Sequence, residues 1–133
     1  MLTLLIAGVT LGTCGVLRAC LRDRAASGGE RVRFQPLWNR RGAFDLPLGR
    51  KALTALPALV LAAVWLCRRQ SPVGAGLLLG GGLSNLWERL RQGAVFDYLR
   101  FPKAPGPLKR YVYNLADFAV FAGALALLLG KRR

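Results

Sequence analysis

The sequence predicts an all-α membrane protein built as a bundle of four transmembrane helices. Three observations support this fold class. Hydrophobic residues make up 53% of the 133-residue chain, and its mean hydropathy is +0.33. They are concentrated in four blocks: residues 2–17, 52–67, 72–87 and 112–129. The basic residues, 20 Lys and Arg against 6 Asp and Glu, lie mostly between these blocks, where they can face anionic lipid headgroups.

Each block is close to the length of a membrane span. A 16-residue helix is about 24 Å long, slightly less than the ~30 Å hydrocarbon core. Flanking Arg and Lys side chains can snorkel to the interface and close this gap. The alternative is a soluble bundle of four buried helices, each with a polar face. Residues 52–67 contain a single Thr, so the membrane bundle is the better interpretation.

The connections predict how the spans are joined. Residues 68–71 are too few for anything but a tight helical hairpin. Residues 18–51 and 88–111 form two long extramembrane loops. We therefore expect residues 1–133 to form one membrane domain, with both termini on one side of the bilayer and both long loops on the other.

The long loops also carry local signals. Residues 31–34 alternate polar and apolar side chains, as a short half-buried strand would. Residues 45–49, DLPLG, are typical of a turn. Three prolines, at positions 102, 105 and 107, exclude a continuous helix in the second loop.

The charge and cysteine patterns exclude several functions. The basic residues do not follow one helix face or strand, so we expect no nucleic-acid partner. Three cysteines without a histidine fit no zinc or disulfide framework, and they allow no Ser/His or Cys/His catalytic set. Glycines 80–82 suit close helix packing, but no Lys-Ser or Lys-Thr follows them, so they form no phosphate loop. We expect neither a metal nor a cofactor.

Polar residues at the ends of two blocks are the candidate site. Ionisable groups at membrane depth are costly, so they usually face the protein interior and mark function. Two aspartates, Asp97 and Asp117, would be brought to the same membrane face. If they approach each other in a pocket of low dielectric, they share a proton and can activate a water molecule. Their expected neighbours are Asn85, Glu88, Arg89 and Asn114.

Three motifs resemble those of a known family. Residues 81–98 contain GGLSNLWER, then Gly93, then VFDY, and resemble the signature GGxxGNxxDRxxxGxVVDF of type II (prolipoprotein) signal peptidases. Residues 113–117, YNLAD, resemble the family's FNxAD motif. Residues 39–44, NRRGAF, resemble its NxGAAF motif. The order and spacing of the motifs and the four-span layout agree with the family from about residue 30 to 125.

The resemblance implies an intramembrane aspartic endopeptidase of the bacterial plasma membrane. It would remove signal peptides from lipid-modified prolipoproteins, cleaving before the diacylglyceryl-cysteine. Asp97 and Asp117 fall on the catalytic pair. Substrate-binding and supporting positions fall on Asn39, Asn85, Glu88, Arg89 and Asn114. The resemblance also implies a small extracytoplasmic β-rich cradle, which suits residues 30–50.

The chain departs from the family pattern at several positions. Glu88 replaces an Asp, Ser84 replaces a Gly, and Arg41 replaces another Gly. The family carries an Asp and a nearby Lys in its first span, whereas residues 2–17 hold no charge. The family's site opens to the extracytoplasmic face. The two long loops carry 15 of the 20 basic residues, which the positive-inside rule would place in the cytoplasm.

Two other functions remain open from the sequence. The first is a catalytically inactive relative that binds lipidated peptides or anionic membrane lipid through its basic loops. The second is an ion or proton carrier that uses Asp117 and has no need of Asp97. The peptidase interpretation is preferred because the completeness of the motifs outweighs the departures from them. The motifs do not indicate which prolipoproteins are cut, nor do they indicate an oligomeric state.

Overall fold

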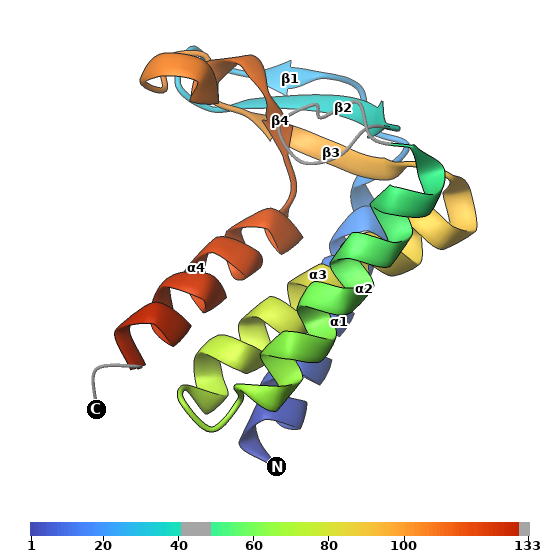
Figure 1. Cartoon of the computed structure of the whole chain (residues 1–133). Coiled ribbons are helices and arrows are strands. Elements are labelled where there is room, and N and C mark those ends of the chain that lie inside the picture. The colour runs from blue at the N-terminus through green and yellow to red at the C-terminus, as the bar shows by residue number, and fades with distance from the viewer. Residues whose placement is uncertain (41–48, 131–133) are drawn as a thin grey trace.

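The computed structural model describes residues 1–40 and 49–130, and shows four helices below a small antiparallel sheet (Figure 1). The helices are α1 (Leu2–Leu21), α2 (Arg50–Leu66), α3 (Pro72–Gln92) and α4 (Leu115–Gly130). The strands are β1 (Ser27–Gly28), β2 (Arg33–Asn39), β3 (Val95–Arg100) and β4 (Val112–Tyr113), with a short 3₁₀ helix, η2 (Gly106–Arg110), before β4. The start of α1 and the end of α4 lie at the end of the bundle away from the sheet.

The first helix is longer than the apolar block that predicted it. α1 continues four residues past Leu17 and includes Arg18. Arg, Ala and Leu are all good helix formers, so a charge that ends an apolar block need not end a helix. The expectation of an uncharged first helix is therefore wrong, and the cation inside it becomes important below.

The predicted hairpin between the second and third helices is confirmed. Ser71 accepts a hydrogen bond from the backbone N–H of Gly74 at 3.1 Å and so caps α3, with Pro72 as the first helical residue. At its other end α3 stops at Gly93, which has a φ of +71°. Glycine adopts this left-handed conformation without strain, so it ends the helix just before β3.

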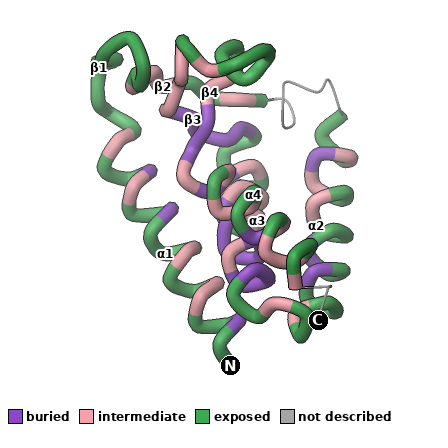
Figure 2. Tube along the Cα trace, turned by 90° about the vertical axis from the view of Figure 1, so that its left-hand side faces the viewer, coloured by how far each residue is buried: buried purple, intermediate pink, exposed green. Residues whose placement is uncertain are grey.

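The third helix is the centre of the bundle. It packs against α1 on one side and α4 on another, and α2 packs beside it. The buried hydrophobic residues gather on α3 and its neighbours, as Figure 2 shows: Leu61, Val64, Ala75, Leu78 and Leu79. α3 and α4 approach closely because small residues face each other. A Cβ added at Gly123 would lie 2.5 Å from the carbonyl oxygen of Gly74.

Gly123→Ala is expected to destabilise the protein by about 2 kcal/mol, because the new methyl group forces α4 away from α3. Gly12→Ala is the matched control, since nothing lies within 4 Å of a Cβ at that position of α1. The control should be neutral or slightly stabilising. Thermal unfolding of both variants in the same detergent tests this prediction. Equal midpoints would show that the α3–α4 contact is not tight.

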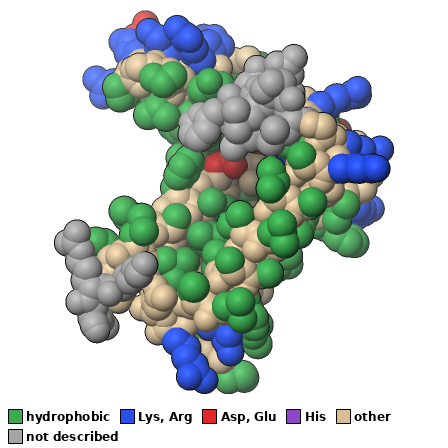
Figure 3. Space-filling model, viewed as in Figure 1, with side chains coloured by type: hydrophobic (Ala, Val, Ile, Leu, Met, Phe, Trp, Pro, Cys, Tyr) green, Lys and Arg blue, Asp and Glu red, His purple; other side chains and the backbone are tan. Residues whose placement is uncertain are grey.

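The outer surface of the helices is largely apolar. Large hydrophobic side chains are exposed on all four helices, for example Leu5, Leu59, Leu83 and Phe121. Figure 3 shows hydrophobic side chains over the middle of the bundle, with Lys and Arg at the two ends. By length and composition α1 is the one described helix that could cross a membrane, and α4 is a shorter apolar helix. Such a surface suits contact with lipid.

The strands of the sheet come from both long connections between helices. Its order is β1-β2-β3-β4, and all neighbouring strands are antiparallel. The cradle expected within residues 30–50 is thus only partly right, because two of its strands follow α3. Residues 112 and 113, expected in the fourth span, form β4, and α4 begins at Leu115. Residues 41–48, which hold most of the expected turn and of the NRRGAF motif, lie outside the described residues.

Candidate active site

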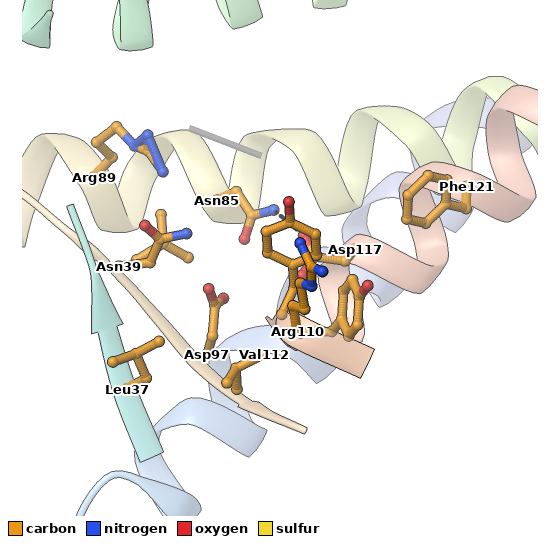
Figure 4. Close-up of a pocket in the computed structure, with 12 residues that line it drawn as sticks. Leu37, Asn39, Asn85, Arg89, Asp97, Arg110, Val112, Asp117 and Phe121 are labelled. Atoms are coloured by element: carbon orange, nitrogen blue, oxygen red, sulfur yellow. Dashed lines mark hydrogen bonds between the residues drawn. The ribbon is translucent and has the colours of Figure 1, made fainter. Parts of the chain in front are cut away.

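A cavity of about 510 Å³ lies between the sheet and the helices (Figure 4). Five of the seven predicted site residues line it: Asn39, Asn85, Arg89, Asp97 and Asp117. They come from β2, β3, α3 and α4. The remaining described lining residues are Leu37, Val95, Arg110, Tyr111, Val112, Tyr113 and Phe121. The space-filling view shows acidic atoms in the recess below the sheet (Figure 3).

Asp97 reaches the cavity because of the alternation of strand β3. It lies opposite Leu37 in the pairing of β2 with β3, and Asn39 lies opposite Val95. Opposed residues of an antiparallel pair share a face, and positions two apart share it as well. All four residues therefore face the cavity. Asp97 is only 4% exposed, and the Asn39 side chain hydrogen-bonds to it.

Asp117 is positioned by the way α4 begins. The side-chain oxygen of Asn114 accepts a hydrogen bond from the backbone N–H of Asp117 at 3.0 Å. In return, Oδ2 of Asp117 accepts one from the backbone N–H of Asn114 at 2.9 Å. This reciprocal pair is a capping box. Asn114 directly precedes α4 and caps it, and its side chain meets that of Asp117 there.

Asn114 joins the two aspartates. Its Nδ2 donates to Oδ1 of Asp97 at 2.9 Å, while its backbone N–H holds Asp117. Asn85 completes the network, because its Nδ2 donates to Oδ1 of Asp117 at 3.2 Å and its Oδ1 accepts from Asn114 at 3.0 Å. Asn114 is 1% exposed. Both carboxyl groups are thus fixed by one buried asparagine and face one cavity.

A cation from α1 supports this network from behind. Arg18 is 5% exposed and donates to the backbone oxygen of Ser84 at 3.0 Å, to the Ser84 hydroxyl, and to Oδ1 of Asn85 at 2.7 Å. Because Asn85 accepts from Arg18, its NH₂ group must point at Asp117. Arg18 lies on the buried face of α1. It follows Cys14 by four residues, so both lie on one helix face, and both are buried.

Two further residues were not expected at the site. Arg110, the last residue of η2, and Tyr111, which follows it, line the cavity. Their position depends on how the second long loop folds back over the helices, which no local pattern encodes. Glu88, in contrast, was expected at the site. It is 8% exposed but does not line the cavity, and its Oε1 has no hydrogen-bond partner among the described residues.

The cavity favours a protonated Asp97. Burial raises the pKa of this carboxyl group to about 7, and the nearby negative charge of Asp117 raises it as well. The Asn39 hydrogen bond, the positive charge of Arg18 and the Asn114 hydrogen bond act in the opposite direction. Around neutral pH the two aspartates can therefore hold one proton between them, which suits a pair that polarises a carbonyl and activates water.

A metal site finds little support in the same region. Across residues 1–40 and 49–130, no three His, Cys, Asp or Glu side chains gather closely enough to hold an ion. The two aspartates are instead occupied by asparagine donors.

Known proteins with similar sequences point to one family. The family profile described as signal peptidase (SPase) II matches residues 15–131. A lipoprotein signal peptidase of Nitrobacter hamburgensis is 42% identical over 63% of this chain, and one of Methylorubrum extorquens is 38% identical over 75%. The chain spans 56% and 63% of the length of these two relatives.

Solved structures share the fold. Two bacterial membrane enzyme structures obtained by the in meso method superpose with TM-scores of 0.82 and 0.79. The alignments cover 97% and 98% of this chain and 91% and 87% of the other chains, at 16% sequence identity in both cases. At this identity the likeness concerns the fold alone.

Proposed function

Because this chain belongs to the signal peptidase II family, we propose that it is a membrane aspartic endopeptidase that removes signal peptides from lipid-modified bacterial prolipoproteins. Cleavage would occur just before the lipid-modified cysteine. The observation that carries the proposal is the meeting of Asp97 and Asp117 around Asn114 in one cavity.

The two aspartates have different roles in the proposed mechanism. Asp117 accepts N–H donors on both oxygens, from Asn85 and Asn114, and these donors hold its carboxyl group in place. It takes a proton from the attacking water. Asp97, which keeps its proton to a pH of about 7, donates a hydrogen bond to the scissile carbonyl oxygen. As water adds, the proton of Asp97 passes to the carbonyl oxygen, which gives a diol. Asp117 then gives the proton it took from water to the amide nitrogen, Asp97 takes back a hydroxyl proton, and the C–N bond breaks to release the acid and the amine.

Neighbouring residues would bind the substrate and keep the acids in place. Asn39 on β2 and Arg89 on α3 line the cavity on the side of Asp97, and both carry donor groups suited to substrate carbonyls (Figure 4). Asn85 and Asn114 orient the carboxyl groups. Glu88 would act only through the packing of α3, since it does not line the cavity.

The surroundings suit a substrate that arrives within the membrane. The chain would form a single multi-pass domain of the bacterial plasma membrane, with four short spans. The cavity lies at the sheet end of the bundle and its rim includes the apolar Phe121, 52% exposed on α4. An apolar signal peptide could pack there while its lipid stays in the bilayer. We place the sheet on the extracytoplasmic side, where a lipid-modified cysteine is exposed after export.

Cleavage of a synthetic precursor tests the proposal. The purified chain in detergent micelles is mixed with a precursor peptide whose cysteine carries a diacylglyceryl group. Mass spectrometry should find a product that begins at this cysteine. The same peptide without the lipid is the matched control and should be cut slowly or not at all. A folded chain that leaves the lipidated peptide intact would contradict the proposed function.

The cleavage rate is expected to fall as the pH rises above about 7. Above this pH Asp97 loses its proton, so the pair carries two negative charges and can no longer polarise the carbonyl. The apparent upper pKa of kcat/KM should lie near 7, and the rate should drop about tenfold for each further pH unit. Initial cleavage rates in matched buffers measure this falling part of the pH–rate profile. A rate that stays constant to pH 9 would show that no proton of the pair is required.

A further inference from the structure

A second cavity, of about 340 Å³, lies at the corner where β2 ends, α2 begins and α3 ends (Figure 1). Its described lining contains three arginines and no carboxylate: Arg40, Arg50, Leu53, Arg89, Gln92 and Gly93. Guanidinium groups repel one another when they converge, and they bind phosphate through paired N–H donors. The lining is therefore matched to an anion with several acceptor oxygens.

The start of α2 adds an independent indication. Gly49 occupies the N-cap and supplies no side-chain cap, and the first turn holds no acidic residue. It holds Arg50 and Lys51 instead, which oppose the positive end of the helix dipole. The first-turn N–H groups of this 17-residue helix therefore lie among cations and receive no side-chain cap from Gly49. A bound anion would offset this unfavourable charge, because helix N-termini bind phosphate groups well.

The apolar side of the cavity indicates which anion fits. Leu53 is buried at its wall, and the next apolar residues along the same face of α2 are Leu56 and Val60, which are 51% and 54% exposed. They lie about one and two helical turns beyond Leu53, away from the basic end. A molecule with a phosphate group and an acyl chain can thus place its head among the arginines and its chain along α2.

We propose that this cavity binds the phosphate group of an anionic phospholipid. The ligand class is a glycerophospholipid whose headgroup has a net negative charge. Arg89 lines this cavity and also the one that contains Asp97 and Asp117. A lipid bound here therefore contacts a residue of the candidate active site. That consequence rests on the proposed function, whereas the binding itself does not depend on cleavage.

Binding of short-chain lipids to the full-length chain in detergent tests the site. Phosphatidylglycerol and phosphatidylcholine with identical acyl chains are titrated by native mass spectrometry. The wild type should bind phosphatidylglycerol at least about tenfold more tightly. Arg50→Gln should weaken that binding about tenfold, through loss of charge-assisted hydrogen bonds. Lys51→Gln is the matched control, since it removes the same charge from the next residue outside the cavity, and should change the affinity less than about threefold.

Several outcomes would overturn the proposal. Equal weakening by Arg50→Gln and Lys51→Gln would show attraction to a basic surface without a defined site. Displacement of phosphatidylglycerol by equimolar inorganic phosphate would show that the acyl chain adds nothing and that the ligand is not a lipid. Circular dichroism checks that the variants are folded, and Arg40→Gln replaces Arg50→Gln if the latter is not. A chain that cuts precursors but fails the lipid test keeps the proposed function and loses only this site.

Discussion

Asp97→Asn is expected to abolish cleavage of a lipidated precursor, by at least about 10³-fold, while the chain stays folded. The amide keeps the size of the carboxyl group and can still accept the hydrogen bond from Asn114. It cannot share a proton with Asp117 or pass one on. Asp117→Asn should have a similar effect on the rate. Its single amide oxygen can replace only one of the two acceptors that face Asn85 and Asn114, so some stability is lost as well.

The stability of the wild type relative to Asp97→Asn should depend on pH in a defined direction. In the folded state the pKa of Asp97 is about 7, above its value in the unfolded chain. The native protein therefore binds the extra proton, and the wild type loses stability as the pH rises from about 4 to about 7. The loss is on the order of 4 kcal/mol and is absent in the variant. Thermal unfolding at pH 5 and pH 8 measures this difference. The stability of the variant relative to that of the wild type should be greater at pH 8 than at pH 5.

Asp23→Asn is the matched control for both measurements. Asp23 is exposed just after α1, and this variant should cleave at the rate of the wild type. The catalytic assignment fails if Asp97→Asn or Asp117→Asn cleaves as fast as Asp23→Asn does.

Arg18→Met is expected to cost the protein about 3 kcal/mol of stability and at least about tenfold in cleavage rate. Removal of the Arg18 guanidinium group leaves acceptors on Ser84 and Asn85 unsatisfied. It also takes away the buried positive charge behind the two aspartates. Without that charge the pKa of Asp97 should rise further, because Arg18 lowers it. The upper limb of the pH profile should then move to higher pH, a shift that loss of packing alone would not produce.

Two other variants define the role of this arginine. Arg18→Lys keeps the charge but loses the paired donors, so it should restore the pH profile and only part of the stability. Arg22 is exposed and lies one helical turn beyond Arg18. Arg22→Met should therefore leave the cleavage rate and its pH profile unchanged. If Arg18→Met and Arg22→Met behave alike in both readouts, Arg18 has no influence on the aspartates.

Much of this architecture could be predicted because the four helices are encoded by continuous apolar blocks. The four blocks, the hairpin at residues 68–71 and the convergence of Asp97 and Asp117 on one cavity all follow from such local patterns together with motif order. Arg18 could not be found in this way. A charged residue at the end of an apolar block is usually an interfacial flank, and its burial depends on Ser84 and Asn85, which are more than 60 residues away in the chain.

The sheet was harder to predict for a related reason. β4 has two residues and β3 has six, so neither shows a long alternating pattern. Strand pairing is a contact between distant segments, and the register that places Asp97 opposite Leu37 is interrupted by an irregularity between Phe34 and Leu37. A shift of one residue would turn Asp97 away from the cavity. The position of Asp97 is therefore set by the register of strand pairing, which local sequence patterns do not specify.

The capping box at the start of α4 has a consequence for how the site assembles. Asp117 becomes competent only when its own helix has nucleated, since the bonds that orient its carboxylate are the same bonds that close the first turn. Tyr98 adds a second tie, because its hydroxyl accepts the N–H of Leu115 and links the strand of Asp97 to that turn. A chain whose final helix is still disordered, during insertion or after damage, would thus lack a functional acid pair. Proteolytic capacity and completion of the fold would appear together.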